Sequence, residues 1–145
     1  MRNVLTHLLC LGAALALGNC QDKNDDTSNL TNRRWMLKEI DGQWISYSSY
    51  GYDYDSFVQF DAPGAGVSGL AACTTIQGKY GLDAGNKRLV ITGMTTTPGA
   101  CSDLNVATKY LAALPQTKRY DIRGDQLLLY ADDTDKPHLV FEALK

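Results

Sequence analysis

The chain has 145 residues, of which 44% are hydrophobic and 21% charged, and this composition predicts one globular domain. Its formal net charge at pH 7 is −2. A mildly acidic protein lacks the basic patch that replaces counterions on a phosphate backbone, so nucleic-acid binding is excluded as an expected function.

Residues 1–19 have the layout of a secretory signal. A short positive start precedes the apolar run Val4–Leu17, and small residues follow. This run is too short to cross a bilayer, because a spanning helix needs about 20 apolar residues. Leu17–Cys20 resembles a bacterial lipobox, in which Cys20 becomes the lipidated first residue, although the asparagine before it is unusual. Cleavage after Ala16 by ordinary signal peptidase is the alternative.

Residues 20–31 are expected to form a flexible tether, and residues 32–145 the folded domain. The tether is rich in Asp, Asn, Ser and Thr, and Leu30 is its one aliphatic residue. Such a segment cannot bury enough surface to offset the entropy of ordering it.

The strongest local prediction is a β-hairpin at Asp41-Gly42, a pair typical of a two-residue type I′ turn between apolar runs. The predicted strands are Arg34–Ile40 and Gln43–Tyr47. The period of two places Trp35 and Leu37 on the face expected to enter the core, and Ile40 on the opposite face.

Three tyrosines, Tyr50, Tyr52 and Tyr54, recur at every second residue and would line one face of an extended segment. Such a row is a candidate aromatic platform for a glycan or a partner protein, since tyrosine offers contact area at low entropic cost. The alternative is a variable loop whose tyrosines cover the neighbouring sheet.

The spacing of Gly64, Gly66 and Gly69 matches G-x-G-x-x-G. A dinucleotide site requires this loop to open a helix within a strand-helix-strand unit, whereas the residues that follow are strand-like. We therefore interpret it as a hairpin turn followed by a glycine-containing strand.

The remaining pattern predicts an α+β fold, mainly antiparallel β, with about eight short strands in a curled sheet or partly open barrel around one helix. The further strands are Ser56–Asp61, Thr74–Leu82, Lys87–Gly93, Thr117–Arg123, Gln126–Ala131 and His138–Glu142. Thr95–Gly99 is expected to turn the chain. The helix is expected over about residues 102–114, where Leu104, Ala107, Tyr110 or Leu111 and Leu114 recur at helical spacing before Pro115.

Three segments resemble, in order, the G-x-x-G-C-N, G-x-Y and T-x-x-A-C motifs of the META domain family, also called HslJ-like. They are Gly66–Cys73, Gly78–Tyr80 and Thr97–Cys101. The chain departs from the pattern at Ala72 and Thr74, where the family has Gly and Asn, and at Ser102, where it has Glu. The resemblance covers roughly residues 30–144. It implies a role in envelope stress and antibiotic tolerance, without an agreed ligand or reaction.

Cys73 and Cys101 are expected to form a disulfide. Cys10 leaves with the signal, and if Cys20 carries lipid, the other two remain as an even pair in an oxidising compartment. The bond would close a loop of about 29 residues and stabilise the domain by about 3 to 4 kcal/mol. Two buried free thiols and a redox-active pair are the alternatives; neither cysteine lies in a C-x-x-C.

Catalytic, metal and cofactor sites are not expected. His138 is the only histidine left after the signal, and no G-x-S-x-G or second histidine accompanies it, so we expect a surface or edge-strand residue. Asp132–Asp135 lacks the glycine and distal glutamate of a Ca²⁺ loop and is expected to be a solvated turn.

These features predict a monomeric, non-enzymatic lipoprotein of the bacterial cell envelope, held by Cys20 at the outer membrane and free of cofactors. An envelope protein or a glycan is the expected partner. The alternative is a secreted binding module or inhibitor that uses the Tyr50–Tyr54 row.

Overall fold

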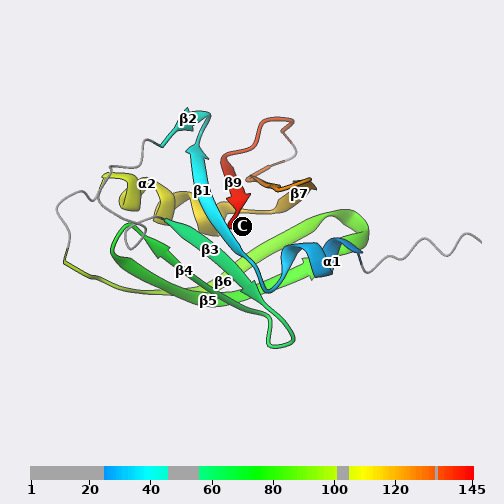
Figure 1. The fold of residues 1–145 in the computed structure, drawn as a ribbon, viewed down its shortest axis with the longest axis horizontal. Helices are drawn as coiled ribbons and strands as arrows, with labels where there is room; N and C mark the ends of the chain where they lie inside the picture. Colours follow the sequence, from blue (N-terminus) through cyan, green and yellow to red (C-terminus); the bar gives the residue numbers. More distant parts are fainter. Residues whose placement is uncertain (1–24, 46–55, 101–104, 133) are drawn as a thin grey trace, which may run out of the picture.

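The computed structural model describes residues 25–45, 56–100, 105–132 and 134–145. These residues form one nine-stranded sheet and one main helix, so the predicted α+β class with mainly antiparallel strands is confirmed. The strand order is β2-β1-β3-β4-β5-β6-β7-β8-β9, and β1 also pairs with β9. The sheet therefore closes into a ring, although not a regular barrel (Figure 1).

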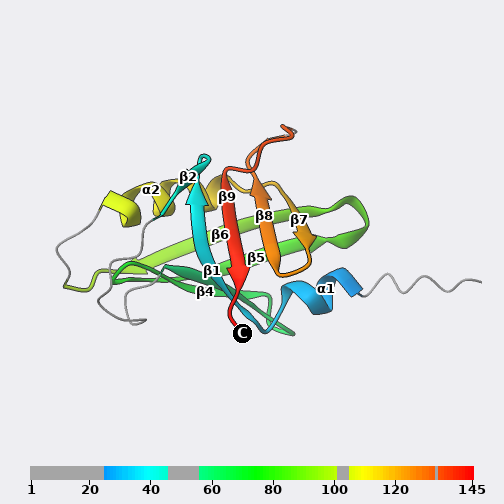
Figure 2. The same ribbon diagram turned by 45° about the horizontal axis from the view of Figure 1, so that its top comes forward.

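Short antiparallel strands make up most of the described chain. They are β1 (Arg34–Ile40), β2 (Gln43–Trp44), β3 (Phe57–Asp61), β4 (Gly66–Ala71), β5 (Thr74–Asp83), β6 (Arg88–Thr97), β7 (Arg119–Arg123), β8 (Gln126–Tyr130) and β9 (Leu139–Ala143). The helices are α1 (Asp25–Leu30) and α2 (Asn105–Ala113), with 3₁₀ turns at Ala84–Asn86 and Leu114–Gln116. In Figure 2, β1, β9, β8 and β7 lie side by side across the long β5–β6 hairpin.

The predicted hairpin at Asp41-Gly42 is confirmed, with Ile40 paired to Gln43 and both turn residues at positive φ. Trp35 and Leu37 are fully buried, as expected. The prediction for Ile40 is wrong, because it is only 5% exposed. The register between β1 and β9 shifts between Leu37 and Glu39, and this irregularity returns Ile40 to the core face.

The prediction of a tether reaching residue 31 is wrong in its last part. The chain is helical over α1, and Leu30 is fully buried in the core. Trp35 Nε1 donates to the Leu30 carbonyl oxygen at 2.9 Å, and Asn32 N donates to the Phe60 carbonyl oxygen at 2.8 Å. One buried leucine and these hydrogen bonds order a segment whose composition favours disorder.

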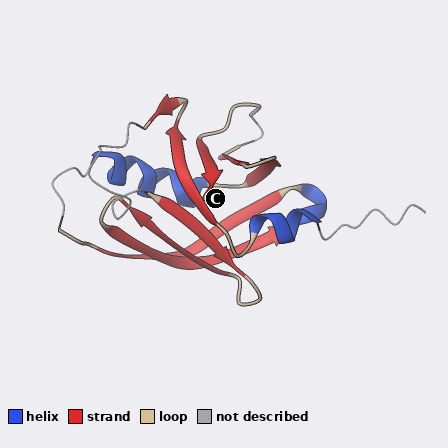
Figure 3. Cartoon of the chain, viewed as in Figure 1, coloured by secondary structure: helices blue, strands red, loops and turns tan. Residues whose placement is uncertain are grey.

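The helix α2 lies along one side of the ring (Figure 3). Ala107, Tyr110 and Leu114 are buried, which confirms the predicted stripe at these positions; residues 101–104 lie outside the described residues. Tyr110 Oη donates to the Phe57 carbonyl oxygen at 3.2 Å and so links α2 to β3. The helix is followed by a 3₁₀ turn that contains Pro115.

The segment Gly64–Gly69 and the end of β6 test two further predictions. The glycine-rich segment is a turn followed by β4, as interpreted, and an added Cβ at Gly69 would meet the Phe57 carbonyl oxygen at 2.5 Å. The expected turn at Thr95–Gly99 is wrong in its first part, because β6 continues to Thr97. A register shift between Gln77 and Lys79, opposite Gly93 at φ 59°, lets the two strands stay paired beyond it.

Candidate functional site

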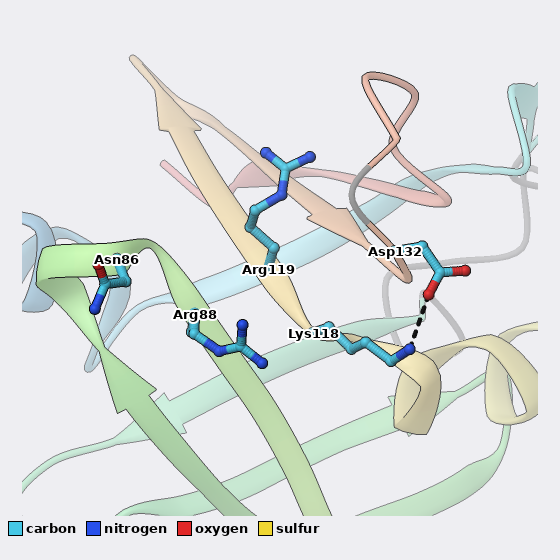
Figure 4. Close-up of a pocket in the computed structure, with 5 residues that line it drawn as sticks. All are labelled: Asn86, Arg88, Lys118, Arg119 and Asp132. Carbon is cyan, nitrogen blue, oxygen red and sulfur yellow. Dashed lines mark hydrogen bonds and ion pairs between the residues drawn. The ribbon is translucent and has the colours of Figure 1, made fainter.

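A pocket of about 410 Å³ lies where the beginning of β6 meets the beginning of β7. We call it the basic pocket. Its lining residues are Asn86, Arg88, Lys118, Arg119 and Asp132 (Figure 4). With three cations and one carboxylate, the lining carries a formal charge of +2, in a chain whose net charge is −2.

Two arginines face each other across the β6–β7 ladder. Arg88 and Arg119 are Cα partners, flanked by hydrogen bonds from Leu89 N to the Lys118 carbonyl oxygen (3.1 Å) and from Tyr120 N to the Lys87 carbonyl oxygen (3.0 Å). This pattern makes Arg88 and Arg119 a non-hydrogen-bonded pair, the kind in which opposite side chains start closest together. Like charges directly opposite in a sheet destabilise it.

The three cations of the basic pocket differ in their contacts. Arg119 donates to the Thr134 carbonyl oxygen at 2.7 Å, and its guanidinium carbon lies 4.2 Å from the centroid of the Tyr130 ring. Lys118 Nζ lies 2.8 Å from Asp132 Oδ1, and its hydrogen bond and charge lower the pKa of that carboxyl. Arg88 is exposed and forms no ion pair within the described ranges. Figure 4 shows Arg119 extending away from Arg88.

A neighbouring charge cluster groups two cations around one carboxylate. Lys87 Nζ lies 3.3 Å from Asp121 Oδ1, and Arg123 Nε lies 2.8 Å from Asp121 Oδ2. Burial alone would raise the pKa of Asp121, but the hydrogen bonds from Arg123 and Lys87 outweigh it and lower the pKa. Each cation of this cluster therefore has a carboxylate partner, and the cluster carries a formal charge of +1.

The sequence reasoning missed the basic pocket. The available signal was a repeated dipeptide, Lys87-Arg88 and Lys118-Arg119, each at the start of an expected strand. Nothing in the local pattern says that β6 and β7 are neighbours, because a strand, a helix and a turn separate the two dipeptides.

A model of the META domain family matches residues 28–143. The chain belongs to the META domain family. Among curated proteins, none matches the chain. The NMR structure of a protein from Burkholderia xenovorans has a TM-score of 0.61 at 21% identity, over 98% of this chain and 99% of that one. A crystal structure of a DUF4847 family protein from Bacteroides vulgatus has a TM-score of 0.57 at 18% identity, over 78% and 93%. At these identities the likeness shows the fold alone.

The histidine of the META domain is more enclosed than predicted. His138 is half-buried and directly precedes β9, which pairs with both β8 and β1, so the expected surface or edge-strand position is wrong. Its Nε2 lies 3.4 Å from Thr117 Oγ1, whereas its buried Nδ1 has no hydrogen-bond partner among the described residues. Burial lowers the pKa of His138, partly offset by the charges of Asp41 and Asp132.

Most of the other predicted site residues fall outside the described residues. These are the lipidation candidate Cys20, the disulfide candidate Cys101 and the tyrosines Tyr50, Tyr52 and Tyr54. Cys73 lies in the tight turn between β4 and β5. Gly99 approaches it so closely that an added Cβ would clash with the Cys73 carbonyl oxygen.

None of the helices in the described part of the META domain has the length and apolar character needed to cross a membrane. No three His, Cys, Asp or Glu side chains are grouped to hold a metal ion in the same ranges. Asp132 of the acidic turn lies against Lys118 of the basic pocket.

Proposed function

We propose that this META domain protein is a non-enzymatic lipoprotein of the cell envelope that acts in envelope stress or antibiotic tolerance. The observation that carries the proposal is the position of the domain. The family match begins at residue 28 and α1 begins at Asp25, so the apolar run Val4–Leu17 and Cys20 both precede the fold. Acyl chains on Cys20 would hold the domain at a membrane through a linker of only four residues, 21–24.

A disulfide between Cys73 and Cys101 is part of the proposal. The close approach of Gly99 brings the chain near Cys73 two residues before Cys101. Such a bond would tie the β4–β5 turn to the segment that leads into α2. Peptide mapping without reductant should recover the two cysteines in one linked peptide pair. If both cysteines are fully alkylated in protein taken from the envelope, the proposed disulfide is contradicted.

The lipid anchor is tested by the intact mass of protein extracted from the envelope. We expect a polypeptide beginning at Cys20 with a diacylglyceryl group, and loss of membrane association in Cys20→Ser. A soluble species that begins at Leu17 would instead support cleavage after Ala16 and would contradict the anchor.

The physiological role is tested in a deletion strain challenged with antibiotics that act on the envelope. Survival should fall in the deletion strain and return with the wild-type gene, but not with Cys20→Ser. We expect His138→Gln to restore survival fully, because the proposed role needs no acid–base catalysis. Equal survival of the deletion and parent strains would overturn the role in tolerance, and failure of a folded His138→Gln protein would support an enzyme.

A further inference from the structure

We propose that the basic pocket binds a phosphate monoester group, held chiefly by Arg88 and Lys118. This inference goes beyond the proposed function and does not depend on the lipid anchor. It begins from the cross-strand pair of Arg88 and Arg119, which places two like charges where opposite side chains start closest together. A bound anion would offset the positive charge that the two strands bring together.

Arg88 is the cation of the basic pocket that is most available to a ligand. It is exposed and has no carboxylate within ion-pair distance in the described ranges. Asp83, the Cα partner of Arg88 across the β5–β6 ladder, accepts hydrogen bonds from Asn86 N and Nδ2, and these bonds together with the charge of Arg88 lower its pKa. Figure 4 shows Arg88 between Asn86 and Lys118. A guanidinium presents its donors in a fixed fork that matches phosphate oxygens.

Lys118 can be recruited by a ligand, because its present partner holds it weakly. The side chains of Lys118 and Asp132 are 60% and 68% exposed, and ion pairs between exposed groups contribute little to stability. Arg119 keeps its contacts with Thr134 and Tyr130 and adds to the positive potential without moving.

Charge and volume together favour a phosphate monoester over a carboxylate. The lining charge of +2 matches a dianion, and the cations approach from two strands, which suits a tetrahedral oxyanion better than a planar one. The volume of about 410 Å³ is within the range of small-molecule sites and exceeds that of a bare phosphate ion. The ligand therefore carries its phosphate on a larger group, either a soluble molecule or a lipid headgroup.

The direct test is a titration of purified protein with phenyl phosphate, followed by amide shifts of Leu89 and Tyr120, with phenylacetate as the carboxylate comparison. We expect saturable shifts with phenyl phosphate that weaken at higher salt, at least tenfold weaker binding in Arg88→Gln, and unchanged binding in Lys109→Gln, a control cation exposed on α2. Equal binding by Arg88→Gln and wild type would overturn the proposal. Equal losses in Arg88→Gln and Lys109→Gln, or equal binding of phenylacetate, would also overturn it.

The lipid source is tested with vesicles, using the Cys20→Ser protein so that no acyl chain contributes. Vesicles of phosphatidylcholine with phosphatidic acid, which presents a phosphate monoester, should retain this protein only if Arg88 is intact. Retention without a phenyl phosphate response identifies a lipid headgroup, and a phenyl phosphate response without retention identifies a soluble ligand. Absence of both overturns the proposal.

The stability of Arg88→Gln separates a binding role from a structural one. Because the substitution removes both the repulsion with Arg119 and the attraction to Asp83, which faces Arg88 from the other neighbouring strand, the variant should unfold at about the same temperature as wild type. A lower unfolding temperature would show that Arg88 stabilises the sheet and would contradict a site held ready for an anion.

Discussion

The indole nitrogen of Trp35 donates a hydrogen bond of 2.9 Å to the carbonyl oxygen of Leu30. Both residues are fully buried, so this one bond connects the end of α1 to the first long strand within the core. It fixes the point at which the segment that follows the predicted lipid anchor becomes part of the folded domain.

Trp35→Phe is expected to reduce the free energy of unfolding by about 1 to 3 kcal/mol. The change leaves the buried Leu30 carbonyl oxygen without its donor and removes part of a packed ring. Urea unfolding followed by circular dichroism measures the effect. Trp44→Phe is the matched control, because Trp44 is 74% exposed and the change should stay within about 0.5 kcal/mol. Equal effects of the two substitutions would contradict the role of the hydrogen bond.

Ala72 has a φ of 52°, and its amide donates to Ser56 Oγ at 2.9 Å. This left-handed conformation explains why glycine suits the position. We expect the free energy of unfolding of Ala72→Gly to exceed that of Ala72→Val by about 1 to 3 kcal/mol, since a β-branched residue is strained there. Thermal unfolding of both variants tests the order, and a Val variant as stable as the Gly variant would show that the turn adopts another conformation.

Gly69→Ala should destabilise the domain by about 2 kcal/mol or more, because the new methyl group meets the Phe57 carbonyl oxygen and pushes β3 and β4 apart. The comparison is Gly81→Ala, since nothing lies within 4 Å of a Cβ at Gly81 in β5. We expect Gly81→Ala to stay within about 1 kcal/mol of wild type in urea unfolding. If both substitutions reduced the free energy of unfolding by similar amounts, the loss of backbone flexibility, rather than the close approach at Gly69, would be the cause.

Stability should depend on pH through His138. Burial lowers its pKa below the ordinary value near 6.5, so the unfolded chain takes up the proton first as the pH falls. The contribution of neutral His138 is complete above about pH 6.5 and is lost as the pH falls toward the lower folded pKa. The difference in unfolding free energy between wild type and His138→Gln should therefore decrease from pH 7.5 to pH 5.5. A difference that stays constant over this range would show that the pKa is the same in both states.

The sequence predicted what depends on local chemistry. The turn at Asp41-Gly42 and the burial of Trp35 and Leu37 follow from turn preference and a period of two. The position of Ile40 was predicted wrongly because the irregular β1–β9 register changes which face it occupies. That register depends on pairing with β9, a strand about a hundred residues away in the sequence. The burial of Leu30 was not predicted because composition is an average over a segment, whereas this one apolar side chain is enough to anchor the segment in the core.

The basic pocket could not be predicted for the same reason. Arg88 and Arg119 each read as an ordinary exposed position on a strand, and their charges matter only because β6 and β7 are neighbours. The cluster around Asp121 shows the contrast: there, Lys87, just before β6, and Arg123, on β7, both have a carboxylate partner.

Because β1 pairs with β9, the sheet can close only after the final segment of the chain has been synthesised. Trp35 lies opposite Ala143 and Ile40 opposite Leu139, so a polypeptide interrupted before residue 139 leaves one side of β1 with unsatisfied amides and carbonyls. Such an open strand edge is a template for pairing with other chains. An incompletely synthesised chain that lacks β9 is therefore prone to self-association. A chaperone that shields this open strand edge would act before residue 139 emerges.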